Sequence, residues 1–143
     1  MKALFLDIDG VCNSEESLVR QYLKKKIGTS LGIDPQMAFT VGKIILDTGC
    51  VLVISSSWRN HPEGMKQIKS AVYPDIYGKT PNIPDKSRGD EVKAYIKEHP
   101  EITKYAILDD ESDFYKDQPL FKTEWKKGIT KQIAKKVTEY LNE

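Results

Sequence analysis

Two carboxylates at the end of an apolar segment are the first feature of this sequence that points to chemistry. Asp7 lies near the end of the mostly apolar segment 2–8, and Asp9 and Gly10 follow this segment directly. An isolated carboxylate buried at the end of a strand is costly unless it is paired or binds a metal. Residues two apart on a strand point the same way, so both side chains are expected to face one pocket.

A second acidic group follows the apolar segment 105–108. It begins with Asp109 and Asp110, and Asp113 lies close behind. Carboxylates that converge raise one another's pKa values and resist full ionisation, a conflict that a divalent cation removes. Magnesium takes oxygen ligands and pairs naturally with substrate phosphate. We therefore predict one shared acidic pocket that binds Mg²⁺.

A polar segment also follows the apolar segment 50–54. It contains three serines, Trp58 and Arg59. Trp58 has two interpretations, as a packing residue under the loop or as a platform for base stacking. Arg59 has two as well, because it can contact either a substrate phosphate or a neighbouring carboxylate.

The elements that must position these groups are buried strands alternating with amphipathic helices. Such a pattern is typical of a parallel sheet covered on both faces. Ligands of these sheets bind beyond the carboxyl ends of the strands, where all three polar groups lie. The sequence predicts strands at 2–8, 50–54, 76–77, 105–108 and 120–121, and helices at 14–26, 34–49, 62–71, 89–98 and 130–141.

Length and composition narrow the class of protein. The 143 residues are expected to form one domain, 1–143, with a genuine core. Lys and Arg (22) nearly balance Asp and Glu (21), so no global basic field favours nucleic-acid binding. No apolar run is long enough to span a bilayer, and the N-terminal segment is too short and acidic for a signal peptide. The two cysteines make no zinc spacing or disulfide framework, so we expect a cytoplasmic location.

The ordered motifs resemble the haloacid dehalogenase superfamily of phosphohydrolases. Asp-Ile-Asp-Gly-Val at 7–11 is similar to its first motif, the strand that ends at Ser55 to its second, and 107–110 with Asp113 to its fourth. The resemblance covers nearly the whole chain and implies a three-layer Rossmann-like α/β fold with a minimal or absent cap. Three segments more closely resemble the small domains related to the phosphatase parts of RNA-repair proteins, namely 54–59, 88–91 and 108–113.

The resemblance implies a role for each matching residue. Asp7 would attack phosphorus and form an aspartyl-phosphate, and Asp9 would act as general acid and then general base. Ser55, helped by Ser56, would bind a phosphoryl oxygen. Magnesium would be held by Asp7, the backbone carbonyl of Asp9, and Asp109, with Asp110 or Asp113 acting directly or through water.

The third motif of the superfamily is a Lys or Arg ahead of the fourth-motif strand, and two residues fit it. Arg88 is preferred because it begins a predicted helix, whose N-terminus also favours anions. Lys86 is the alternative. The serines pose a similar choice of register, and Ser55 is preferred because it directly follows the apolar run.

The resemblance implies a magnesium-dependent phosphomonoester hydrolase that acts on nucleic-acid ends, nucleotides or another phosphomonoester. Only the segment 11–36 is available as a lid, and small caps in this superfamily accompany large substrates. The basic run 24–26 is either a solvated face or a guide for a polyanion. A phospho-accepting receiver domain is disfavoured because the middle strand ends in serines rather than aspartate. A non-catalytic module that binds metal or phosphate is the second alternative.

Overall fold

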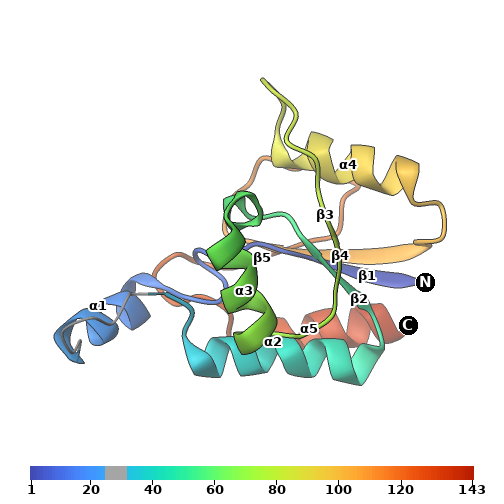
Figure 1. Cartoon of the computed structure of the whole chain (residues 1–143). Coiled ribbons are helices and arrows are strands. Elements are labelled where there is room, and N and C mark those ends of the chain that lie inside the picture. Colours follow the sequence, from blue (N-terminus) through green and yellow to red (C-terminus); the bar gives the residue numbers. More distant parts are fainter. Residues whose placement is uncertain (25–31) are drawn as a thin grey trace.

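The computed structural model describes residues 1–24 and 32–143, and a five-stranded parallel sheet forms its centre (Figure 1). The strand order is β3-β2-β1-β4-β5, so the first strand of the chain lies in the middle. The predicted α/β fold with a parallel sheet is confirmed. The strands are β1 (Lys2–Leu6), β2 (Val51–Ile54), β3 (Ile76–Lys79), β4 (Lys104–Asp109) and β5 (Leu120–Lys122).

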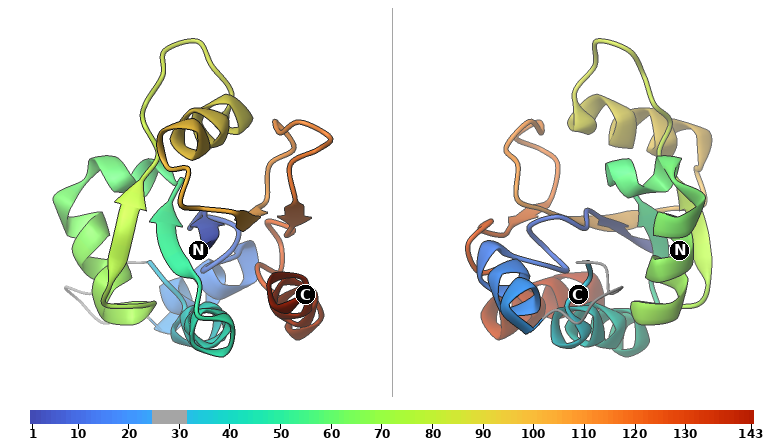
Figure 2. Two further views of the ribbon diagram at one scale, coloured as in Figure 1. Left: turned by 90° about the vertical axis from the view of Figure 1, so that its right-hand side faces the viewer. Right: turned by 60° about the vertical axis from the view of Figure 1, so that its left-hand side comes forward.

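Helices cover both faces of the sheet, which completes the three layers (Figure 2). Successive side chains of a strand point to opposite faces. Leu4 and Leu6 of β1 accordingly pack with α2, α3 and α5, whereas Ala3 and Phe5 pack with α4. The α-helices are α1 (Glu15–Lys24), α2 (Pro35–Thr48), α3 (Pro62–Ala71), α4 (Arg88–Glu98) and α5 (Lys131–Asn142).

Local capping explains where several helices begin and end. The Asp34 carboxylate accepts hydrogen bonds from two backbone N–H groups of α2, and Pro35 occupies its first position. Gly49 ends α2 with a positive φ of 68°, which glycine adopts at little cost. Ser14 caps α1, because its hydroxyl accepts the N–H of Ser17.

The loops at the carboxyl edge of the sheet begin at the ends of β1 and β2. β1 ends at Leu6 rather than at residue 8, since the backbone turns through Gly10, whose φ is 86°. A short 3₁₀ helix, η1 (Ser57–Asn60), begins after β2 under a Ser56 cap.

The α1 helix lies at the opposite end of the sheet from the two chain termini (Figure 1). Residues 25 and 26 of the basic run lie outside the described residues. In the described part of the chain, no helix has both the length and the apolar character needed to cross a membrane.

Candidate active site

Backbone pairing brings the predicted strand ends together. The Asp7 N–H donates to the Leu108 carbonyl at 2.9 Å, and the Ser55 N–H donates to the Leu6 carbonyl at 3.0 Å. Asp7, Ser55 and the end of β4 therefore lie side by side at the carboxyl edge of the sheet. This is the edge at which open parallel sheets bind ligands.

Three carboxylates form a compact cluster at this edge. Asp7, Asp109 and Asp110 each offer an oxygen, and these atoms all lie within 4.8 Å of one another. Asp7 and Asp109 are buried, and Asp110 is half-buried. Carboxylates that lie this close together and are largely shielded from water repel each other strongly unless a cation lies nearby.

Arg88 provides a positive charge in direct contact with the cluster. Its Nη1 lies 2.9 Å from Asp7 Oδ1 and 2.8 Å from Asp109 Oδ2. Burial lowers the pKa of Arg88, but the two carboxylates outweigh this effect and hold its pKa above the usual value. Lys86, the alternative for the third motif, is exposed.

Burial and, to a smaller extent, neighbouring carboxylates raise the pKa values of two members of the cluster. Burial, followed by repulsion from Asp109, raises the pKa of Asp7 to about 7, although Arg88 opposes the shift. Burial likewise raises the pKa of Asp110. Unless further positive charge is present, the carboxylates of the cluster therefore resist being ionised at the same time.

Asp9 lies apart from this cluster. It is exposed, and its carboxylate accepts hydrogen bonds from Trp58 Nε1 at 3.2 Å and from Asn13 Nδ2 at 3.0 Å. The strand periodicity does not govern its direction, because β1 has already ended at Leu6. Trp58 also packs against the main core cluster, as its packing interpretation predicted.

Asp113 also has a place other than the one expected for a metal ligand. Its carboxylate accepts the backbone N–H of Arg88 at 3.2 Å, and its carbonyl accepts that of Gly89 at 3.1 Å. Asp113 does not belong to the three-residue carboxylate cluster. Its contacts attach the first turn of α4 to the loop that follows β4, and of the two expected alternatives it is Asp110 that lies in the cluster.

Gly10 allows the loop after β1 to approach the cluster. A Cβ atom at this position would clash with the Asp110 carboxylate, and the positive φ would add strain. The buried hydroxyl of Thr123 donates to the Gly10 carbonyl and so holds this loop from the β5 side.

The serines after β2 have different environments. The Ser55 hydroxyl is buried and has no hydrogen-bond partner in the described structure, whereas the Ser56 hydroxyl accepts the Trp58 N–H at 3.1 Å. A buried hydroxyl without a partner is costly. Ser55 therefore has a free polar group beside Asp7, while the Ser56 hydroxyl is occupied by its capping role.

Arg59 contacts a neighbouring carboxylate, the second of its two predicted alternatives. The guanidinium is buried and pairs with Glu91 at 3.2 Å. Its other donors contact backbone carbonyls. The hydrogen-bonding groups of Arg59 therefore already have partners within the protein.

The sequence pattern did not identify three residues that support the site. Asn13 bridges the Asp9 carboxylate and the Gly10 N–H. Thr123 follows the last strand, and Glu91 follows Arg88 by three residues. The position of Glu91 one turn after a candidate basic residue was the only local signal among the three.

The donor set of the cluster fits a hard divalent cation. It consists entirely of carboxylate oxygens, the ligands that Mg²⁺ prefers. Burial and the neighbouring Asp109 both disfavour the charged form of Asp7 and so raise its pKa, and a bound cation would oppose both effects. Arg88 supplies part of the positive charge through Asp7 Oδ1 and Asp109 Oδ2, while Asp109 Oδ1 accepts the Glu111 N–H at 2.9 Å.

The parallel sheet, with these acids at its carboxyl edge, defines a small domain of the haloacid dehalogenase superfamily, as the motifs predicted. The family model described as "HAD domain in Swiss Army Knife RNA repair proteins" matches residues 3–134, and the chain belongs to this family. Membership points to a phosphohydrolase-type function. Comparisons with curated proteins and with solved structures gave no match.

Proposed function

We propose that this protein is a magnesium-dependent phosphomonoester hydrolase that acts through an aspartyl-phosphate. The observation that carries the proposal is the convergence of Asp7, Asp109, Asp110 and Arg88 at one sheet edge. Phosphoryl transfer depends mainly on positioning and on charge stabilisation, and this arrangement supplies both.

Asp7 is the proposed nucleophile. One of its carboxylate oxygens attacks phosphorus, the bond to the leaving oxygen breaks, and Asp9 gives that oxygen a proton. Asp9 then removes a proton from water, which attacks the phosphorus of the aspartyl-phosphate. The second step releases inorganic phosphate and restores both carboxyl groups.

Ser55 and Arg88 are the proposed ligands of the phosphoryl group, and the Ser56 N–H is a proposed additional donor. A phosphoryl oxygen would supply the partner that the Ser55 hydroxyl lacks. Arg88 would balance the negative charge of the transferring group, as donors fixed in advance do in a dry site.

Asp7, Asp109 and Asp110 would hold Mg²⁺, with the Asp9 carbonyl as a further candidate ligand. When bound, the ion would neutralise charge on the carboxylates and on the phosphoryl oxygens. Asp113 is better explained by its contacts with the start of α4.

The proposed substrate is a phosphorylated nucleic-acid end. The family description places these domains in RNA-repair proteins. A screen of 3′- and 5′-phosphorylated oligonucleotides, nucleotides, phosphopeptides and sugar phosphates tests the substrate class.

Asp7→Asn tests the nucleophile. We expect this variant to lose hydrolysis of an aryl phosphate in the presence of Mg²⁺, because the amide cannot attack phosphorus. Asp47→Asn, on the exposed face of α2, is the matched control and should keep full activity. Undiminished turnover by a folded Asp7→Asn variant would reject Asp7 as the nucleophile.

Asp109→Ala tests the metal site. We expect weaker Mg²⁺ binding in calorimetry, because one of three clustered carboxylates is lost. Asp113→Ala should bind Mg²⁺ as the unmodified protein does. Equal affinity of the Asp109→Ala variant and the unmodified protein would remove Asp109 from the ligand set.

A further inference from the structure

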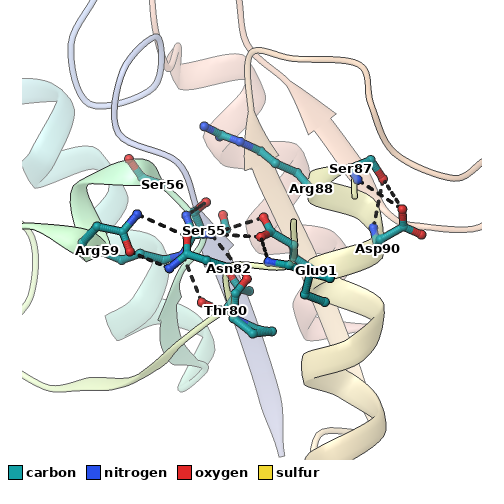
Figure 3. A network of polar contacts seen from close by, with 12 residues as sticks. Ser55, Ser56, Arg59, Thr80, Asn82, Ser87, Arg88, Asp90 and Glu91 are labelled. Atoms are coloured by element: carbon teal, nitrogen blue, oxygen red, sulfur yellow. Dashed lines mark hydrogen bonds and ion pairs between the residues drawn. The ribbon is translucent and has the colours of Figure 1, made fainter. Parts of the chain in front are cut away.

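Arg59 lies at the centre of a buried polar network that joins three segments of the chain (Figure 3). Its Nη1 donates to the Ser55 carbonyl at 3.0 Å, and its Nε donates to the Thr80 carbonyl at 3.0 Å. Its Nη2 lies 3.2 and 3.3 Å from the two carboxylate oxygens of Glu91. The side chains of Arg59 and Glu91 are only 4% and 11% exposed, so water screens this contact little.

Glu91 extends the network into α4. Its Oε2 also accepts the N–H of Ile83 at 2.9 Å, in the loop that precedes the helix. Glu91 lies three residues after Arg88, so one helical turn carries both side chains. Arg59 thus connects the strand end that bears Ser55 with the helix that bears Arg88.

Stability alone is a weak reason for burying this ion pair. Removing two charges from water is expensive, and well-packed apolar residues often stabilise a fold equally well. The planar guanidinium, however, has five donors in a fixed fork and can hold several acceptors in one geometry. At Arg59 those acceptors belong to separate segments that meet beside the carboxylate cluster.

We propose that Arg59 and Glu91 are positioning residues that set the separation of Ser55 and Arg88, so that both can reach one phosphoryl group. The inference rests on the proposed function for the identity of that group. Arg59 and Glu91 act through the loop and the helix that they join, without contacting the substrate. A misplacement of about 1 Å can lower the rate of an enzyme on the order of a hundredfold.

Arg59→Lys is the principal test. Lysine keeps a positive charge opposite Glu91, but its single ammonium group cannot reproduce the fork that holds Ser55 and Thr80. With an aryl phosphate, we expect kcat to fall roughly tenfold or more and KM to rise. Mg²⁺ affinity should stay unchanged in calorimetry, since the three clustered carboxylates are intact.

Glu91→Gln is a second variant, and it serves if Arg59→Lys does not fold. The amide oxygen can still accept the Ile83 N–H, but the paired contact with Arg59 is weakened, so kcat should fall in the same direction. Two exposed side chains, each in an ion pair, provide matched controls. Arg20→Lys on α1 and Glu139→Gln on α5 make the same chemical changes elsewhere and should leave kcat and KM unchanged.

Kinetics and crystallography distinguish a failure of the positioning role from a failure of the proposed function. A folded Arg59→Lys variant with unchanged kcat and KM would overturn the positioning role while the proposed function stands. No turnover of any phosphate ester by the unmodified protein would overturn the proposed function instead. In that case, crystal structures decide the positioning role. A changed separation between Ser55 Oγ and the Arg88 guanidinium in Arg59→Lys supports it, and an unchanged separation contradicts it.

Discussion

Asp7 and Asp9 are two residues apart, yet they lie in different surroundings. Asp7 is buried beside Asp109, and this environment raises its pKa to about 7. Asp9 is exposed and accepts hydrogen bonds from Trp58 and Asn13. A residue that exchanges protons with water and with a leaving group benefits from such access, whereas a nucleophile benefits from fixed, dry surroundings.

Trp58→Phe tests whether turnover depends on the hydrogen bond that the indole N–H of Trp58 donates to Asp9. The phenyl ring keeps much of the packing but removes the indole N–H. A hydrogen bond to a charged group contributes about 1.5–3 kcal/mol, so a loss of roughly tenfold in kcat is expected. KM for an aryl phosphate should change little, because Ser55 and Arg88 are untouched. Trp125→Phe, at a side chain 44% exposed, is the control. Equal kcat values for the two variants would show that the indole hydrogen bond has no role in turnover.

At the scale of elements, the N-terminus of α4 is the most elaborately fixed part of the site. Ser87 and Asp90 form a capping box, in which each side chain accepts the backbone N–H of the other. Asp113 adds its contact with the Arg88 N–H. Gly89 allows close approach, because a Cβ there would crowd Gln118 and the backbone of the loop after β4. The first turn of α4 therefore holds Arg88 in place.

Ser87→Ala should separate positioning from stability when it is compared with Thr130→Ala. Each substitution removes the side-chain cap of one helix, α4 or α5, and each is expected to cost about 1 kcal/mol of unfolding free energy. Only Ser87→Ala should lower kcat, because only α4 carries Arg88. Urea denaturation and steady-state kinetics provide the two measurements. Equal kcat values would show that the cap stabilises α4 without positioning Arg88.

At the scale of the whole molecule, the core and the site make opposing contributions to stability. The apolar residues of β1 are fully buried between the two helical layers. Burial of apolar surface is the dominant favourable term in folding. The carboxylates at the end of the same strands oppose it, because burial disfavours their charged forms.

The unfolding free energy of the metal-free protein should reveal this opposition as the pH changes. The pKa of Asp7 is higher in the folded protein than in the unfolded chain. The stabilising contribution of this difference to the unfolding free energy is therefore fully present below about pH 4. That contribution is lost as the pH rises through about 7. Asp7→Asn should therefore match the unmodified protein in acid and become the more stable of the two at pH 8.

Urea denaturation in EDTA at several pH values measures this difference. Asp47→Asn, at an exposed position, serves as the control and should show no comparable trend. A constant difference between Asp7→Asn and the unmodified protein across the range would contradict a raised pKa at Asp7. Mg²⁺ should reverse part of the loss in the unmodified protein at pH 8, because a ligand that binds only the folded state stabilises it.

The fold was predictable because its signals are local. Apolar segments alternate with amphipathic ones, and Asp34 with Pro35 begins a helix, as such a pair does in many proteins. The carboxyl-edge position of Asp7 and Asp109 followed from the parallel sheet alone. The exact end of β1 was not predictable from neighbouring residues alone, because the turn at Gly10 also contacts the hydroxyl of Thr123, more than a hundred residues away.

The order of strands, helices and motifs in the sequence determined the family and the edge of the sheet at which chemistry is possible. Hydrophobic periodicity and turn residues act between neighbours in the chain, and one sequence therefore reveals them. The tertiary structure alone decided which partner each polar side chain contacts. Arg88 contacts the carboxylate cluster, and Arg59 pairs with Glu91. Trp58 and Asn13 both donate hydrogen bonds to Asp9. Hydrogen bonds and ion pairs act over only a few ångströms, and they can join residues that are far apart in the sequence. These partners are therefore determined by how the elements pack together.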